Sequence, residues 1–86
     1  MQTHSELLRL SEARRRLPVP PMRTQIRQAA RVSCEEMAAT LGVHKSTLFA
    51  WEGGAMPQAR YVVAYVELLD ELRAVVEGAG DVPASR

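Results

Sequence analysis

The amino-acid sequence predicts an all-α protein, a bundle of about four to five helices. The chain has 86 residues, of which 47% are hydrophobic and 24% charged, which is the balance of one small globular domain. Apolar residues recur at helical spacing in several segments. Proline and glycine separate these segments at 18–21, 42 and 53–54, as expected of helix boundaries.

The N-terminal unit, residues 1–17, is expected to contain an amphipathic helix over residues 5–16. Ser5 is a candidate N-cap. Three prolines within residues 18–21 then prevent a continuous helix and form a stiff linker. The consecutive arginines at 14–16 either complement the helix dipole or form a basic patch for phosphate or a partner. The leucines of this helix form a short apolar side, at Leu7, Leu8 and Leu10.

Two helices flank the central stretch of the predicted domain, which covers residues 22–77. The first, over residues 22–31, has an arginine at every fourth position. The second, over residues 58–77, is the longest and most apolar. Its valines make the apolar face wider than one small core requires, which indicates either packing of the N-terminal helix or a dimer surface. Residues 78–86 are expected to form a flexible tail.

The central stretch, residues 34–52, has the pattern of two short helices joined by a tight turn. Ser33 and Glu36 form a capping box before the first of them. Gly42 ends this helix in the left-handed conformation that glycine adopts at low cost. The second short helix covers residues 44–52 and is stopped by two glycines.

This stretch meets the steric demands of a helix-turn-helix unit, in which two short helices cross closely. Counted from Cys34, a small residue, Ala38, stands at the fifth position and Gly42 at the ninth. Because this unit docks its second helix on DNA, the pattern favours DNA binding. Large apolar residues stand where they would support the crossing, at Met37, Leu41, Val43, Leu48 and Trp51.

The segments SCEEMAATLGV and LGVHKSTLFAWEGGAMP resemble the helix-turn-helix of the lambda-repressor/Cro family, also called xenobiotic-response-element-type regulators. The similarity covers roughly residues 22–70, and the flanking segments resemble small actinobacterial or actinophage members. The resemblance implies a lambda-repressor-like bundle with an extra N-terminal helix. It also implies a structural ion pair between Arg27 and Glu52, which would hold the second short helix at its angle.

The same resemblance implies that the outward face of the second short helix enters the major groove of DNA. Lys45 would donate to guanine O6 and N7, and Phe49 would pack on thymine methyl groups. Arg60 and the helix end near Cys34 would contact phosphate. The expected DNA contacts are Lys45, Ser46, Phe49, Ala50, His44, Thr47, Arg60 and Cys34.

Several of these residues also have a purely structural interpretation. Phe49 could contact a protein partner as well as a base. Cys34 could be a small half-buried structural residue, and Lys45 could be a solvated residue on the surface of the helix. The outward face has a single cation and no Gln, Asn or Arg for bidentate base recognition. Affinity would therefore depend on phosphate contacts, a second subunit or the arginine-rich N-terminal segment.

The charges are distributed unevenly along the chain. Residues 1–31 contain seven arginines and two glutamates, a balance of +5, whereas residues 32–86 contain four basic and eight acidic residues, a balance of −4. If the fold keeps these segments apart, the molecule has one basic and one acidic surface. The basic surface would attract phosphates.

Other classes of protein are not supported by the sequence. No segment approaches the ~20 apolar residues of a membrane span, and the N-terminus does not resemble a secretory signal. A single cysteine, Cys34, fits a reducing cytoplasm, and neither His4 nor His44 is spaced from it as a metal ligand would be. No nucleophile–base pair or phosphate-binding glycine loop is present, so no enzymatic activity, cofactor or metal site is predicted.

The predicted function is sequence-specific binding of double-stranded DNA by a homodimer that regulates transcription. The chain would be a repressor or a control protein of a phage or mobile element, located in the cytoplasm and on the nucleoid when bound. The alternative is a protein-interaction module of the antitoxin or anti-repressor type that keeps the fold without binding DNA. The acidic second half and the sparse charge of the outward face favour this alternative.

Overall fold

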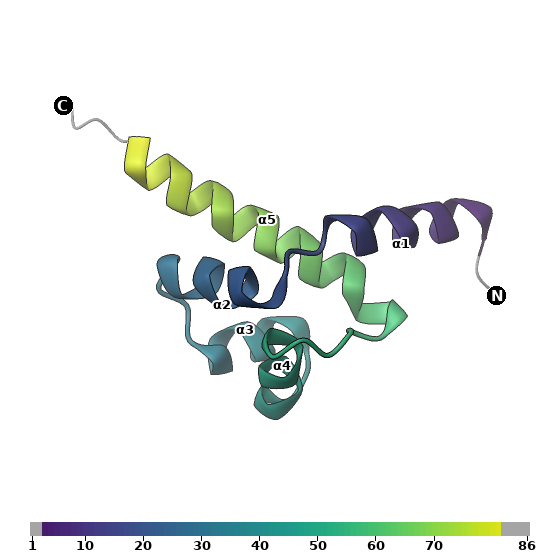
Figure 1. Cartoon of the computed structure of the whole chain (residues 1–86), viewed down its shortest axis with the longest axis horizontal. Helices are drawn as coiled ribbons and strands as arrows, with labels where there is room; N and C mark the ends of the chain where they lie inside the picture. The colour runs from purple at the N-terminus through teal and green to yellow at the C-terminus, as the bar shows by residue number, and fades with distance from the viewer. Residues whose placement is uncertain (1–2, 82–86) are drawn as a thin grey trace.

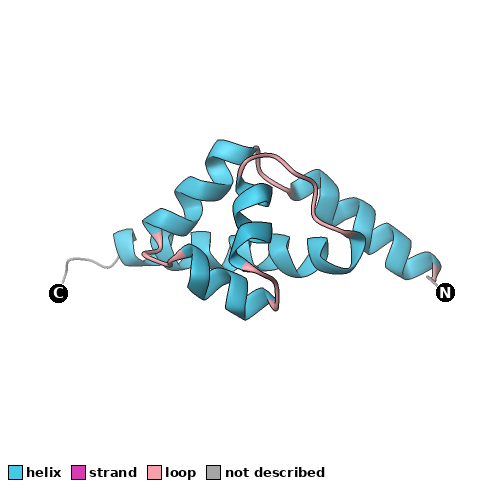
Figure 2. Cartoon of the chain, turned by 90° about the horizontal axis from the view of Figure 1, so that it is seen from below, coloured by secondary structure: helices cyan, strands magenta, loops and turns pink. Residues whose placement is uncertain are grey.

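The computed structural model describes residues 3–81, with side chains up to residue 78. α5 runs along α2, α3 and α4, which lie on one side of it, while α1 lies against its N-terminal half and extends past its N-terminal end (Figure 1). Figure 2 shows that the described residues form helices joined by short loops, without strands. The all-α prediction is confirmed, with five helices: α1 (His4–Arg16), α2 (Pro20–Ala29), α3 (Cys34–Leu41), α4 (Lys45–Glu52) and α5 (Ala59–Asp81).

The two N-terminal helices each begin earlier than predicted. The N-cap of α1 is Thr3, and the prediction of Ser5 is wrong. Thr3 forms a capping box with Glu6, because its hydroxyl accepts the Glu6 amide and the Glu6 carboxylate accepts the Thr3 amide. α2 begins at Pro20, since proline is tolerated in the first turn, where the amides have no helical partner. The linker is therefore shorter than residues 18–21.

The other helix ends follow from local backbone chemistry. α2 stops at Ala29, before the predicted end at residue 31, and Arg31 adopts a positive φ of 61°. The predicted capping box of Ser33 and Glu36 starts α3, and Gly42 ends it at φ 75°, both as expected. α5 continues to Asp81, four residues beyond the predicted end, and residues 82–86 of the expected tail lie outside the described part of the chain.

The main core lies where α2, α3, α4 and α5 meet. Its central residue is Tyr65, whose ring is fully buried and stacks at a tilt against Trp51, with ring centroids 5.0 Å apart. This centroid separation lies within the range in which aromatic pairs attract each other. The buried members of this cluster are Ile26, Met37, Ala38, Leu48, Trp51, Tyr65 and Leu69.

A second, smaller core joins α1 to the N-terminal half of α5. Leu10 and Ala13 of α1 pack on Val62 and Val66 of α5, and all four are buried. The excess of valines in α5 therefore serves packing of the N-terminal helix, at least over this half of the helix. At the other end, Val75 remains 61% exposed.

Ion pairs reinforce the contact between α1 and α5. Arg9 pairs with Glu67, with Nη2 3.1 Å from Oε2, and Arg16 pairs with Asp70. The condition set for separate basic and acidic surfaces is not met, since the fold brings Arg9 and Arg16 of the basic segment onto acids of the other segment. Because both pairs are exposed, each contributes only about 0–1 kcal/mol to stability.

Within residues 3–81, no helix is long and apolar enough to cross a membrane. The longest helix, α5, has acidic and basic side chains along its exposed side, among them Glu67, Glu71, Arg73 and Glu77.

Candidate nucleic-acid interface

The interface is built on α3 and α4, which are joined by a three-residue turn. Met37 and Ala38 of α3 and Leu48 and Trp51 of α4 are all at most 4% exposed, so the inner faces of both helices are fixed in the core. The turn is closed by a hydrogen bond from the Val43 amide to the Ala38 carbonyl oxygen, 3.0 Å long. These inner residues are the ones that the sequence pattern assigned to the inside.

The C-terminal end of α4 is fixed by an ion pair between Arg27 and Glu52. Arg27 donates to both carboxylate oxygens, with Nη2 3.0 Å from Oε1, and its Nη1 donates to the Val32 carbonyl oxygen at 3.0 Å. The Thr24 hydroxyl donates to the same carboxylate at 3.2 Å. The side chains of Arg27 and Glu52 are only 12% and 5% exposed. The hydrogen bond to Glu52 raises the pKa of Arg27, against the opposing effect of burial.

A second buried arginine, Arg23, supports the same end of α4 and was not predicted from the sequence. Its Nη1 donates to the Trp51 carbonyl oxygen at 2.8 Å, and its Nε donates to the Pro18 carbonyl oxygen at 2.7 Å. A cation at the carboxyl end of a helix is favoured by the helix dipole. The four-residue spacing of Arg23 and Arg27 puts both on one stripe of α2, but the spacing alone does not show that this stripe faces the end of α4.

The opposite face of α4 points to solvent. Four of the predicted contact residues lie there, and Phe49 is 70% exposed although it is one of the largest apolar side chains in the chain. Lys45 forms an ion pair with Glu35 of α3, with Nζ 3.7 Å from Oε2. The exposed residues of this face are Lys45, Ser46, Phe49 and Ala50.

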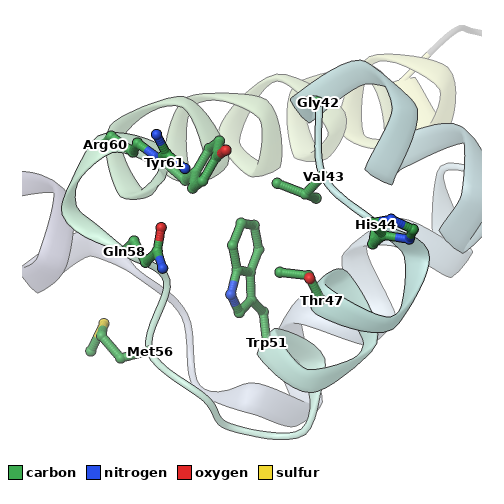
Figure 3. A pocket seen from close by; sticks show the side chains of 9 residues that line it. All are labelled: Gly42, Val43, His44, Thr47, Trp51, Met56, Gln58, Arg60 and Tyr61. Atoms are coloured by element: carbon green, nitrogen blue, oxygen red, sulfur yellow. The ribbon is translucent and has the colours of Figure 1, made fainter.

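An open concavity of about 420 Å³ lies beside this face, between the start of α4 and the start of α5 (Figure 3). His44, Thr47 and Arg60, three of the predicted DNA contacts, line it together with Gln58. In Figure 3, the rings of Trp51 and Tyr61 lie between the side of the concavity formed by His44 and Thr47 and the side formed by Gln58 and Arg60. The Arg60 guanidinium lies 4.9 Å from the centre of the Tyr61 ring, a cation–π contact that positions it at the rim.

Cys34, the remaining predicted contact residue, lies outside this concavity. It is half-buried, and its thiol donates to the Lys45 carbonyl oxygen at 3.9 Å. It therefore links the first turns of α3 and α4, which fits the structural interpretation of this residue. Residues 3–78 contain no group of three or more His, Cys, Asp or Glu side chains able to hold a metal ion.

The arrangement supplies hydrogen-bond donors, two cations and exposed apolar atoms on one side of a rigidly held short helix. Such a surface can bind anions and the edges of bases. The class of protein that the fold defines is a small all-α domain. Comparisons of the chain with protein-family models, curated proteins and solved structures found no significant match. Function is therefore inferred from the geometry of α3, α4 and the start of α5.

Proposed function

We propose that the chain is a sequence-specific regulator that binds double-stranded DNA with a lambda-repressor-like helix-turn-helix, inserting α4 in the major groove. Lys45, Ser46, Phe49 and Ala50 would contact base edges. The residues of the concavity, with Arg60 as their cation, would contact the phosphate backbone beside the groove. In this role the protein would act in the cytoplasm on the nucleoid, as a repressor or as a control protein of a phage or mobile element.

The exposed face of α4 is the observation that carries this proposal. α4 is anchored by Leu48, Trp51 and Glu52, and its other side is left without intramolecular cover except at Lys45. Hydrogen bonds from Arg23 and Arg27 fix the C-terminal end of α4 and so its orientation on the domain. A recognition helix requires a fixed orientation because its side chains reach the bases only at a defined angle to the groove. At the centre of this face, Phe49 is 70% exposed, so its ring is available for apolar contact with the edges of bases.

A homodimer is part of the proposal, because one copy has few base-reading groups. The candidate contact surface is the C-terminal part of α5, where Val75 is exposed beside half-buried Leu72 and Val76. Two recognition helices about one helical turn apart, ~34 Å, would then read a palindromic site. Val75→Glu should shift the protein from dimer to monomer in sedimentation equilibrium, and an unchanged mass would exclude this surface.

The first test is binding of the duplexes recovered by in vitro selection from a random pool. Lys45→Ala should weaken binding by about 1–3 kcal/mol, the range for a bidentate base contact, and Phe49→Ala should also weaken it through the loss of apolar contact with thymine methyl groups. Arg14→Ala and Leu8→Ala are matched controls, since they remove an exposed cation and an exposed leucine from α1, outside the proposed DNA-binding and dimer surfaces. Equal losses in the variants and in their controls would refute the assignment of the groove face.

Salt provides the second test. Each phosphate that the protein neutralises contributes about −0.9 to the slope of log K against log salt. Arg60 is the cation of the proposed phosphate contacts, so a dimer, with two copies of it, should show a slope of about −2. Arg60→Ala should reduce this slope without changing the selected sequence, because a phosphate contact carries no base information.

Binding of a protein partner is the second candidate function, as expected of an antitoxin or anti-repressor. Phe49 favours it, because a large exposed apolar residue at the centre of a surface can anchor a partner as well as a base. The outcome of the selection distinguishes the two functions. The protein partner is favoured if the selection enriches no duplex and if the remaining binding of duplex DNA does not change with salt concentration.

A further inference from the structure

Lys45, the only cation on the outward face of α4, is held by a carboxylate of the same molecule. Its Nζ lies 3.7 Å from Oε2 of Glu35, and the two side chains are 61% and 74% exposed. Lys45 is the first residue of α4 and Glu35 the second residue of α3, so the pair bridges the N-terminal ends of both helices. The hydrogen bond from the Cys34 thiol to the Lys45 carbonyl oxygen keeps these two ends together.

We propose that Glu35 lowers the DNA affinity of this chain by competing with DNA for Lys45. The proposal rests on the proposed function and adds a residue that tunes it. When Lys45 moves to a base or phosphate, its attraction to Glu35 is lost, so the pair opposes binding. Exposed ion pairs are worth up to about 1 kcal/mol, which corresponds to an affinity about fivefold weaker than that of a chain without the carboxylate.

Glu35 also has a structural role that must be separated from this one. A carboxylate in the first turn of α3 complements the helix dipole, with or without Lys45. The end of α3 is already capped by Ser33 and Glu36, whose reciprocal hydrogen bonds are 2.8 and 3.0 Å long. A neutral residue at position 35 should therefore leave the helix formed, so that any change in DNA affinity can be measured on a folded protein.

The test is a double-mutant cycle on the full chain with Glu35→Gln and Lys45→Ala. The probe is a fluorescein-labelled duplex pool of mixed sequence, followed by anisotropy at low salt. Glu35→Gln should tighten binding by about two- to fivefold and steepen the salt slope by up to about 0.9 per chain. In the Lys45→Ala background, Glu35→Gln should change nothing. Glu71→Gln is the matched control, since it removes an exposed glutamate from α5.

Each other outcome overturns the inference. No gain from Glu35→Gln would show that the pair does not oppose binding, and an equal gain in both backgrounds would show direct repulsion of phosphate. An equal gain from Glu71→Gln would show an effect of net charge alone. If the wild-type chain binds no duplex, the proposed function and this inference fail together. If it binds and Lys45→Ala weakens it without coupling to Glu35, only the inference fails.

Discussion

Replacement of Arg27 by alanine should destabilise the fold strongly, because Arg27 neutralises a carboxylate that is almost fully removed from water. The Glu52 side chain is 5% exposed and receives two of its three recorded hydrogen bonds from Arg27. The substitution leaves the carboxylate with the Thr24 hydroxyl alone. It also leaves the Val32 carbonyl oxygen without its side-chain donor.

The expected loss can be bounded from these contacts. Removal of one partner of a buried ion pair costs about 3–5 kcal/mol. The remaining Thr24 bond reduces the penalty, so the lower value, ~3 kcal/mol, is expected. A domain of 86 residues has a total stability of roughly 4–13 kcal/mol. The loss is therefore a large fraction of the total, and the variant should unfold at much lower urea concentration.

Urea unfolding followed by fluorescence measures this loss directly, since Trp51 is the single tryptophan and is buried beside Glu52. The control is the double variant Arg27→Met, Glu52→Leu. It removes both charges and should recover most of the stability, because an apolar pair of similar size has no desolvation penalty. A loss below about 0.5 kcal/mol in Arg27→Ala, or a double variant no more stable than the single one, would refute the reasoning.

Four further predictions concern single positions. Burial raises the pKa of Tyr65 to about 12, so the stability that this neutral phenol contributes is complete below pH ~10 and is lost as pH rises from ~10 to ~12. Tyr65→Phe should abolish that loss in urea titrations at high pH and leave neutral-pH stability unchanged or higher, because the buried hydroxyl has no hydrogen-bond partner among the described residues. Gly42→Ala should cost about 1–2 kcal/mol through its positive φ alone, since a Cβ there meets no atom within 4 Å, whereas Gly78→Ala in helical α5 should gain up to ~1 kcal/mol by thermal unfolding. Ser33→Ala should cost about 1 kcal/mol by loss of the α3 cap, and a change below about 0.2 kcal/mol would contradict the capping box.

The parts of the fold that the sequence predicted are those controlled by neighbouring residues. The start of α3 depends on Ser33 and Glu36, and its end depends on Gly42, so local chemistry is sufficient. The error at the start of α1 has the same origin. Thr3 has a glutamate three residues later and Ser5 has a leucine there, so the capping-box rule selects Thr3.

The role of Arg23 could not be predicted in the same way. Its acceptors are the backbone carbonyl oxygens of Pro18 and Trp51. The pattern of side chains in a sequence does not show which backbone carbonyl groups remain without a backbone partner in the folded protein. The role of Arg27 was predictable only because the family resemblance implied an ion pair with Glu52, a residue of opposite charge. The docking of α1 on α5 is also tertiary information, since the same valines would serve a dimer equally well.

The folded positions of the arginines change how DNA affinity must arise in the proposed function. Four of the seven arginines in residues 1–31 are engaged within the molecule, two with acids of α5 and two with the end of α4. The basic N-terminal segment is therefore a weak source of phosphate contacts, because α1 packs on α5 and its charges are partly neutralised there. The contact face instead depends on Lys45 and Arg60, and Lys45 is itself paired. A single copy with so few free cations should bind weakly, so operator recognition would require two copies bound together.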